Sequence, residues 1–171
     1  MADPFELIGT SIDGKYRVDE LIGEGGFGVV YRGFHLSFEQ PIAIKCLKIP
    51  AHFTGEAQAL FLKQFREEGK HLANLSQHPA ITRVYDFGIA HEKSENGVPY
   101  LVLEWLEGET LEAMLAGRAG VPFDESEALE LLMPAIDALA FAHRMKSAHR
   151  DIKPANLIVC QTPLGEVIKV L

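Results

Sequence analysis

The chain has 171 residues, of which 47% are hydrophobic and 23% charged, the balance of an ordinary globular protein. Its 24 acidic residues outnumber 16 Lys and Arg, and the formal net charge of −8 argues against a nucleic-acid-binding protein. No apolar run reaches the roughly 18 residues of a membrane span, and residues 1–6 lack the parts of a signal peptide, so we expect a cytoplasmic protein with no membrane segment within these residues.

The first half of the sequence predicts a sheet with one helix. Residues 1–14 show no regular pattern and are predicted to be a flexible or loosely docked lead-in. Helical spacing predicts a long helix over 56–76, and a polar loop is expected at 91–97. Apolar and β-branched runs predict five strands of an antiparallel sheet, at 16–21, 29–35, 41–47, 81–87 and 98–103.

The second half is predicted to be mainly helical, after a break at 106–108. A short helix is expected over 110–116, and the spacing of Asp124 and Glu127 predicts a capping box that begins a longer helix. Pro134 costs about 3 kcal/mol in an ideal helix and predicts a kink. The apolar stripe of this helix is formed by Ala128, Leu132, Ala135, Leu139 and Ala142.

Glycines at the G-x-G-x-x-G spacing occupy Gly23, Gly25 and Gly28. A glycine lets backbone N–H groups approach a phosphate because no Cβ stands in the way. The same spacing opens dinucleotide-binding folds, but there a helix directly follows the glycines. Here the β-rich run 29–33 follows, so we predict a hairpin whose turn binds phosphate; a plain β-turn is the alternative.

Lys45 lies in an apolar run, where a lysine is costly to bury unless it pairs with an anion. Glu68 interrupts an otherwise apolar helix face, and Glu67 points about 100° away from that face. The apolar members of the face are Phe61, Phe65, Leu72 and Leu75. We therefore predict that Glu68 faces the core and pairs with Lys45; the alternatives are a lysine that reaches water and a glutamate solvated at the edge of the face.

Residues 149–156 place a base, a cation and a metal-binding amide in one short loop. Phosphoryl transfer needs such a set. Asp151 would orient the attacking hydroxyl and take its proton, Lys153 would offset charge on the moving phosphoryl group, and Asn156 would hold a magnesium ion. His149 is predicted to brace the loop from inside.

This run resembles the catalytic loop of eukaryotic-type (Hanks-type) serine/threonine protein kinases. The glycine loop, the strand lysine, the helix glutamate and a hinge precede it in the family's order. Lys153, two residues after Asp151, resembles the serine/threonine rather than the tyrosine kinases, and residues 8–16 and 154–158 resemble bacterial members. The resemblance covers nearly the whole chain but only about the first two-thirds of the family domain.

The resemblance implies ATP and Mg²⁺ as cofactors and a protein substrate, with Lys45 in contact with the α- and β-phosphates. Residues 100–108 resemble the strand and hinge that hold adenine. Leu103 would be the gatekeeper, and the carbonyl of Glu104 and the N–H of Leu106 would meet the adenine edge. The residues expected to sandwich the ring are Ile22, Val30, Ala43 and Ile158.

The run Asp86-Phe87-Gly88 spells the family's second metal motif but stands before the hinge, so we predict a structural role in which Asp86 ends a strand and Gly88 turns the chain. The metal motif would instead follow the strand predicted at 167–171. No residue of this sequence comes after that strand. We therefore expect these 171 residues by themselves to be inactive, with the stripe of the second long helix exposed.

Together these features imply a two-lobed α+β fold of the protein-kinase type. Residues 1–14 would be the lead-in, 15–106 the N-lobe and hinge, and 107–171 a partial C-lobe that ends before the activation segment. The main functional alternative is a pseudokinase, which would bind nucleotide or serve as a scaffold without catalysis. A truncated product is a third interpretation.

Overall fold

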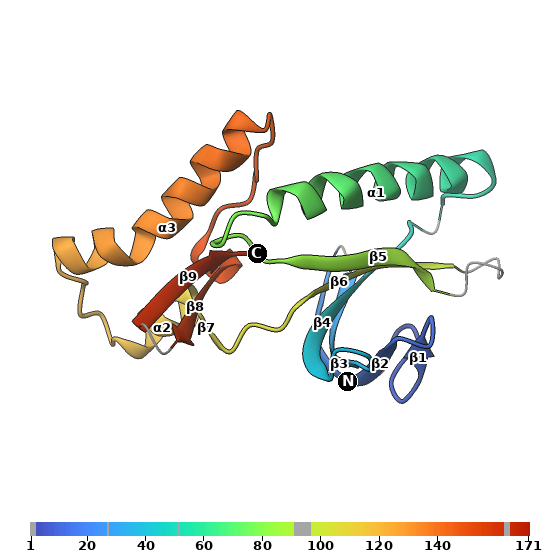
Figure 1. Cartoon of the computed structure of the whole chain (residues 1–171), viewed down its shortest axis with the longest axis horizontal. Helices are drawn as coiled ribbons and strands as arrows, with labels where there is room; N and C mark the ends of the chain where they lie inside the picture. Colours follow the sequence, from blue (N-terminus) through green and yellow to red (C-terminus); the bar gives the residue numbers. More distant parts are fainter. Residues whose placement is uncertain (1–2, 27, 51, 91–96, 163–164) are drawn as a thin grey trace. The chain divides into compact units, whose positions relative to one another are not determined.

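The computed structural model describes residues 3–26, 28–50, 52–90, 97–162 and 165–171. The chain forms two compact units (Figure 1). The first comprises Met1–Ala73 and Val84–Trp105, and the second comprises Asn74–Arg83 and Leu106–Leu171. The loop predicted at 91–97 lies outside the described residues except for Gly97.

The first unit contains a six-stranded sheet in the order β1-β2-β3-β4-β6-β5, in which all neighbours are antiparallel. Its elements are β1 (Ser11–Ile12), β2 (Tyr16–Gly25), β3 (Gly28–His35), β4 (Gln40–Leu47), α1 (Glu56–Leu75), β5 (Val84–Ala90) and β6 (Val98–Glu104). The antiparallel sheet and its single helix are confirmed. β1 is an additional strand, and β5 lies three residues later in the sequence than predicted.

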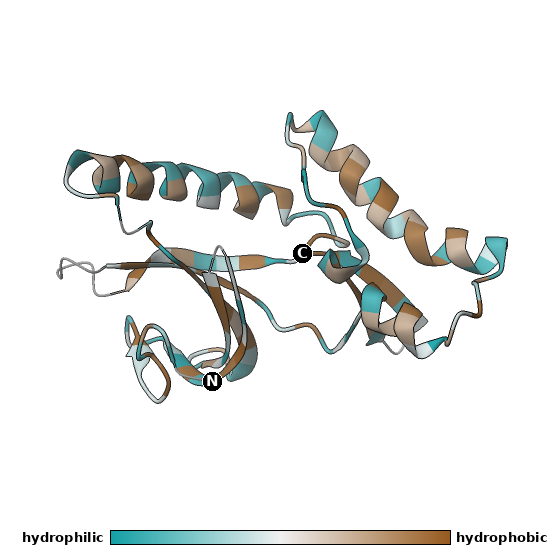
Figure 2. Ribbon diagram, turned by 180° about the vertical axis from the view of Figure 1, so that it is seen from behind, coloured by the Kyte–Doolittle hydropathy of each residue, from teal (hydrophilic) through white to brown (hydrophobic). Residues whose placement is uncertain are grey.

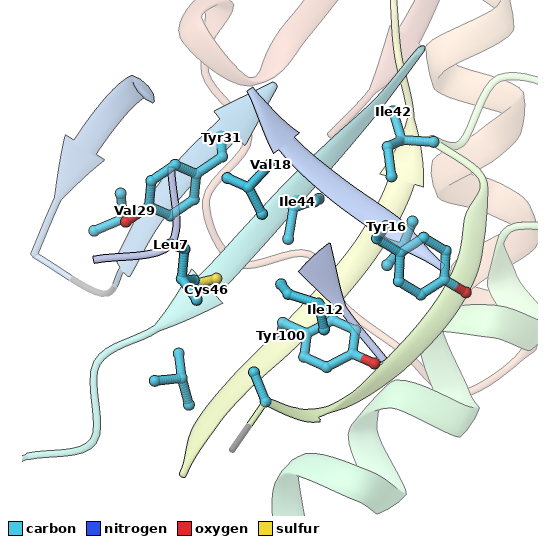
Figure 3. Packing of buried hydrophobic residues seen from close by; sticks show 13 residues of the cluster. Leu7, Ile12, Tyr16, Val18, Val29, Tyr31, Ile42, Ile44, Cys46 and Tyr100 are labelled. Carbon is cyan, nitrogen blue, oxygen red and sulfur yellow. The ribbon is translucent and has the colours of Figure 1, made fainter. Parts of the chain in front are cut away.

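Side chains alternate between the two faces of this sheet, as a pleated strand requires. On one face, Val29 and Tyr31 of β3 pack with Ile42, Ile44 and Cys46 of β4 in the core shown in Figure 3, and all five are 0% exposed. The residues between them on β3 and β4 are more exposed. One face of the sheet is therefore the hydrophobic core, and the other face is left for other contacts.

Cys46 and Cys160 are both buried, and within the described residues neither forms a disulfide. Burial raises the pKa of the Cys46 thiol to about 12, with a smaller contribution from the charge of Asp3. Cys46 is therefore a packing residue of the core, because a thiol that stays protonated is a poor nucleophile.

The N-terminal segment is not loosely docked, so that prediction was wrong. Leu7 and Ile12 belong to the core of the first unit, with exposed fractions of 0% and 3%, and β1 pairs with β2. Pattern analysis missed this packing because single apolar side chains that are five residues apart have neither the helical nor the strand period.

Helix α1 packs on β5 through Phe65 and Gly69. The rings of Phe65 and Phe87 meet edge to face with centroids 6.4 Å apart. A Cβ added to Gly69 would lie 2.8 Å from Cγ of Phe87, so the glycine allows the helix to approach this ring closely. Gly69 is buried and Glu68 is exposed, so the prediction that Glu68 faces the core is not met in this structure. The pattern could not show this, because a glycine adds nothing to an apolar stripe.

Asp86 and Gly88 lie within β5, so the prediction that the strand ends there was wrong. Asp86 has the structural role that its place in the sequence predicted: its Oδ2 accepts a 2.6 Å hydrogen bond from the hydroxyl of Tyr16. A Cβ on Gly88 would lie 2.7 Å from the hydroxyl oxygen of Tyr100, so this glycine makes room for the tyrosine ring.

The second unit has a three-stranded antiparallel sheet in the order β7-β8-β9. Its elements are β7 (Gly108–Thr110), α2 (Leu111–Gly117), α3 (Glu125–Arg144), the 3₁₀ helix η1 (Pro154–Asn156), β8 (Leu157–Thr162) and β9 (Gly165–Val170). The predicted helices correspond to α2 and α3, and the last predicted strand corresponds to β9. β7, β8 and η1 were not predicted. β7 and η1 have three residues each, too few to show a period, η1 lies within the catalytic-type loop of residues 149–156, and β8 directly follows that loop.

The capping box at the start of α3 is confirmed. The side chain of Asp124 accepts a 2.9 Å hydrogen bond from the N–H of Ser126, and the side chain of Glu127 accepts one of 3.3 Å from the N–H of Asp124. The helix continues through Pro134 to Arg144 and changes direction along its length, as Figure 1 shows.

The predicted stripe of α3 is packed rather than exposed. Ala135 and Ala142 are buried, as is Ala138, which the stripe did not include. A neighbouring face carries the exposed apolar side chains of Leu129, Met133 and Ile136, which are 53%, 47% and 48% exposed. Figure 2 shows the many apolar residues along this helix. Within the described ranges, no helix combines the length and apolarity needed to cross a membrane.

The contact between Gly69 and Phe87 predicts that replacing this glycine by alanine lowers stability, the opposite of the usual effect in a helix. In an exposed helix interior, glycine to alanine stabilises by about 1 kcal/mol. Gly69→Ala should instead lower the thermal unfolding midpoint, because the new methyl would overlap the Phe87 ring. Gly117→Ala at the end of α2 is the matched control, since no described atom lies within 4 Å of its added Cβ. A raised midpoint for Gly69→Ala would contradict this packing.

Candidate active site

The glycine-rich run forms the end of the β2–β3 hairpin. Gly23 pairs with Val30, and Gly25 pairs with Gly28, so the glycines lie on two antiparallel strands as predicted. Phe27, between them, lies outside the described residues. This arrangement differs from dinucleotide-binding folds, in which the glycines lead from a strand into a helix.

The glycines of this hairpin differ in whether packing within the sheet requires a glycine at that position. A Cβ on Gly28 would lie 2.2 Å from the carbonyl oxygen of Cys46, so packing against β4 requires a glycine there. A Cβ on Gly23, Gly25 or Gly26 would meet no described atom within 4 Å, and none of the three has the positive φ that favours glycine. Within the described residues these three positions keep space open, which is what the close approach of a ligand to the backbone needs.

Four predicted site residues share the sheet face opposite the core. Val30 of β3 lies directly opposite Lys45 of β4, and Ala43 of β4 lies opposite Leu103 of β6. Because Ala43 and Lys45 are two residues apart, they point to the same side of the sheet. The register therefore brings Val30, Ala43, Lys45 and Leu103 together on one face. Ile22, half exposed at 50%, lies on β2 at an irregularity in its pairing with β3.

The remaining residues predicted to contact adenine are divided between the two units. Glu104 ends β6 in the first unit, whereas Leu106 and Ile158 belong to the second. Ile158 lies on β8, opposite Thr110 and Lys169, and is half-buried.

Lys45 and Glu68 form no ion pair among the residues that the structure describes, and both side chains are exposed. The position of α1 explains this, because Gly69 rather than Glu68 faces the sheet. The pair stays a prediction for a state in which α1 is turned. Lys48 does pair with Glu24 beside the glycine hairpin, with 2.6 Å between Nζ and Oε1.

In the second unit, the loop before β8 brings together the three residues predicted for phosphoryl transfer. Nζ of Lys153 lies 2.9 Å from Oδ2 of Asp151. The side-chain amide of Asn156 donates to the same Oδ2 at 2.9 Å and to the backbone carbonyl of Asp151 at 2.7 Å. Because the amide nitrogen is engaged in this way, the amide oxygen of Asn156 is the atom left to bind a cation.

His149 connects this loop to the end of β9. Its Nε2 lies 2.7 Å from the carbonyl oxygen of Leu171, and its Nδ1 accepts a 3.3 Å hydrogen bond from the N–H of Asp151. Both bonds require the tautomer in which Nε2 carries the proton. His149 thus holds the backbone of Asp151, in line with the bracing role predicted for it.

Arg150 has a backbone conformation that sequence analysis missed. Its φ of 65° lies in the left-handed region, which costs a non-glycine residue of the order of 1–3 kcal/mol and persists only where the surroundings hold it. The hydrogen bonds on either side of it, from His149 and to Asp151, supply that restraint. An arginine gives no sequence signal for such a conformation, because positive φ is usually inferred from glycine or asparagine.

Asp151 is an exposed carboxylate with a stabilised charge. The hydrogen bond from Lys153, followed by the one from Asn156, lowers the pKa of Asp151 below its usual value. The loop therefore holds an ionised carboxylate as an acceptor that can orient a hydroxyl.

Comparison with known proteins gives one consistent result. A model of the protein kinase domain family matches residues 16–170. The serine/threonine-protein kinase PrkC of Bacillus subtilis (strain 168) is 34% identical over 153 residues, which are 90% of this chain and 22% of that protein. The serine/threonine-protein kinase PknA of Mycobacterium tuberculosis (strain ATCC 25618 / H37Rv) is 34% identical over 162 residues, which are 94% of this chain and 35% of that protein.

Solved structures give the same fold. The crystal structure of the Mycobacterium tuberculosis PknI kinase domain superposes with a TM-score of 0.74 at 26% identity and covers 95% of this chain and 60% of its own. The apo form of PpkA-294 has a TM-score of 0.71 at 28% identity, with 92% and 57% covered. The chain therefore spans 22% and 35% of the two curated relatives and about three-fifths of the solved kinase chains.

The contacts of Asp151 predict a measurable titration. In the wild-type chain the carboxyl carbon of Asp151 should titrate below the usual range, and Lys153→Met should raise this pKa by removing the largest stabilising contact. The pair stabilises the fold above the unfolded-state pKa, and this effect is lost as the pH falls through the lowered folded-state pKa. Carbon-detected NMR of the side-chain carboxyl gives the midpoint, and Lys146→Met, at an exposed lysine, is the control. An unchanged midpoint in Lys153→Met would rule out the contact in solution.

Proposed function

Because the chain belongs to the bacterial eukaryotic-type (Hanks-type) serine/threonine protein kinase family and covers part of its kinase domain, we propose that it supplies the first part of a domain that transfers the γ-phosphoryl group of ATP to protein Ser or Thr hydroxyls. The observation that carries this proposal is the loop in which Lys153 and Asn156 both contact the carboxylate of Asp151. Family membership by itself would also fit a domain that has lost catalysis, whereas an intact, ionised Asp151 supports transfer.

ATP would be held first by the glycine hairpin. Gly23 and Gly25 leave the backbone accessible, and no packing or φ requirement of the described residues explains them. The adenine ring would lie on the sheet face formed by Val30, Ala43 and Leu103, with Ile22 beside it and the backbone of Glu104 and Leu106 at its edge. Lys45 on the same face would contact the phosphates, and the family resemblance also assigns Ile158 to the adenine ring.

Mg²⁺ would be held in part by the amide oxygen of Asn156. That atom is suited to the ion because hard cations prefer oxygen ligands and the amide nitrogen is already bonded to Asp151. When bound, the ion neutralises charge on the phosphates. A second protein ligand of the Asp-Phe-Gly type is not among these 171 residues after the catalytic loop, and Asp86 is already bonded to Tyr16 within β5.

Asp151 would accept a hydrogen bond from the substrate hydroxyl and take its proton as the oxygen attacks phosphorus. Lys153 would remain near the transferring group and offset its charge. Glu68 would pair with Lys45 only if α1 turned about its axis, so its role is proposed for the nucleotide-bound state.

The 171 residues by themselves would have little or no kinase activity, because one metal ligand and the substrate-binding part of the domain are not among them. A nucleotide-holding pseudokinase or scaffold is the alternative, and it is favoured for the chain alone because Lys45 and Glu68 do not pair with each other among the described residues. For the domain as a whole we propose an N-lobe and hinge that end near residue 106, a partial C-lobe that begins at residue 107, a protein substrate and a cytoplasmic location.

Nucleotide binding is expected to depend on the glycine hairpin and on Lys45. A Gly25→Val, Lys45→Ala double variant should weaken the binding of a non-hydrolysable ATP analogue at least tenfold, because the new side chain fills the open space and a phosphate contact is lost. Calorimetric titration measures the dissociation constant. Lys63→Ala, at an exposed lysine of α1, is the control, and equal affinity of the double variant and the wild type would refute the proposed binding mode.

Catalysis is expected to depend on Asp151 more than nucleotide binding does. In a version of the chain that carries the remainder of a kinase domain, Asp151→Asn should reduce turnover by a factor of about 10² or more while ATP affinity changes little. Phosphate transfer from radiolabelled ATP and analogue titration give the two numbers, and Asp137→Asn, an exposed change on α3, is the control. Undiminished turnover in Asp151→Asn would remove its proposed role, and turnover by the 171-residue chain equal to that of the longer one would show that the present residues complete the metal site.

A further inference from the structure

Residues 3–13, called the N-terminal strap from here on, form a layer over the core face of the first unit. The strap precedes residue 16, where the match to the family model begins. Leu7 belongs to the same buried cluster as Val29, Tyr31 and Cys46 and lies near them in Figure 3, where Ile12 lies near Tyr100. The strap is therefore part of the folded unit, although it precedes the residues that match the family model.

Backbone hydrogen bonds join the strap to β2. The N–H of Gly9 donates to the carbonyl of Val18 at 2.9 Å, and the N–H of Val18 donates to the carbonyl of Thr10 at 3.1 Å. β1 continues this pairing at Ser11 and Ile12. The strap thus lies alongside β2, the strand that leads into the glycine hairpin.

Two tyrosine hydroxyls connect the strap to strands farther across the sheet. Tyr31 of β3 donates to Oδ1 of Asp3 at 2.6 Å, and Tyr100 of β6 donates to Oδ2 of Asp13 at 2.5 Å. Burial, and then the bond to the carboxylate, raises the pKa of both hydroxyls, so both remain donors. β4 lies between β3 and β6, so the strap connects strands that have no ladder between them.

The strap also anchors its own first residues. The side chain of Asp3 accepts from the N–H groups of Phe5 and Ile8, at 3.2 and 2.8 Å, in addition to the Tyr31 hydroxyl. The carboxylate of Asp3 therefore holds the turn at residues 5–8, which contains Leu7, and also bonds to β3, against which Leu7 packs.

The strap lies directly behind the face proposed to bind nucleotide. Val29 and Tyr31 point toward the strap, so Val30 between them points to the opposite face. The same alternation places Ile44 and Cys46 behind Ala43 and Lys45. A shift of the strap would therefore move β3 and β4, which carry the proposed ligand contacts.

We propose that the N-terminal strap positions the nucleotide-binding face of the sheet, with Leu7 and Asp3 as the positioning residues. The nucleotide part of this inference rests on the proposed function, whereas the strap's effect on β3 and β4 does not. When the strap is loosened, the glycine hairpin and Lys45 lose their relative placement and nucleotide affinity falls.

The test compares Leu7→Ala with Ile8→Ala in the full 171-residue chain. The two neighbouring variants remove similar side chains, but Leu7 is 0% exposed and Ile8 is 43% exposed. Amide hydrogen exchange, read by mass spectrometry of peptides from β3 and β4, should speed up at least about tenfold in Leu7→Ala and change little in Ile8→Ala. Tyr31→Phe, which removes only the hydroxyl that binds Asp3, should give a smaller acceleration in the same peptides, and Leu7→Met should restore most of the protection.

A second measurement, the affinity for a non-hydrolysable ATP analogue, is made at a temperature where both variants are fully folded. Affinity should fall several-fold in Leu7→Ala and Tyr31→Phe and stay at the wild-type value in Ile8→Ala. Unchanged exchange of β3 and β4 in Leu7→Ala would overturn the strap's role. Faster exchange with unchanged affinity would overturn the positioning of the binding face. A wild-type chain that bound no analogue would overturn the nucleotide part, while the exchange data would still decide whether the strap holds the sheet. If Leu7→Ala fails to fold, the exchange and affinity measurements on Tyr31→Phe decide instead. Unchanged exchange of β3 and β4 would overturn the strap's role, and faster exchange with unchanged affinity would overturn the positioning of the binding face.

Discussion

The two-residue period of the sheet in the first unit is the constraint on which its other features depend. Because successive side chains point to opposite faces, every strand that contributes to the core on one face presents its intervening residues on the other. Val29 and Tyr31 in the core therefore imply Val30 on the opposite face, and Ile44 and Cys46 imply Ala43 and Lys45 there. A register slip of one residue would exchange the two faces, so burial of the core also fixes the proposed ligand face.

The catalytic-type loop is held by a different kind of restraint. Asp151 and Lys153 are exposed and Asn156 is only partly buried, so hydrophobic burial contributes little to their placement. Short polar contacts take the place of burial. Lys153 and Asn156 contact the carboxylate of Asp151. His149 accepts from the backbone N–H of Asp151 and bonds to the carbonyl of Leu171, directly after β9. These contacts also hold the left-handed backbone of Arg150. A loop held by hydrogen bonds and ion pairs can keep a carboxylate both accessible and ionised, which burial in an apolar core would oppose.

Helix α1 illustrates how a missing side chain can decide an orientation. The apolar pattern selected the face that contains Glu68, yet the helix presents Gly69 to Phe87 because only a glycine allows the ring so close. Glu68 and Lys45 are left exposed as a consequence. The same helix could pair them only after a rotation, a change of the kind by which two-state elements respond to a ligand.

The sequence by itself determined the elements whose signals are local. The strand period, the helix spacing, the Asp124–Glu127 capping box and the run 149–156 each appear within a few neighbouring residues, and the sheet, α3 and the family agree with them. Only the tertiary structure decided what depends on distant residues. Leu7 packs in the core, and Gly69 packs against Phe87. Asp86 accepts a hydrogen bond from Tyr16, and His149 forms one with the carbonyl of Leu171. The physical reason is that such contacts join single residues that are far apart in the chain, and a lone leucine, aspartate or glycine carries no periodicity that would reveal its partner.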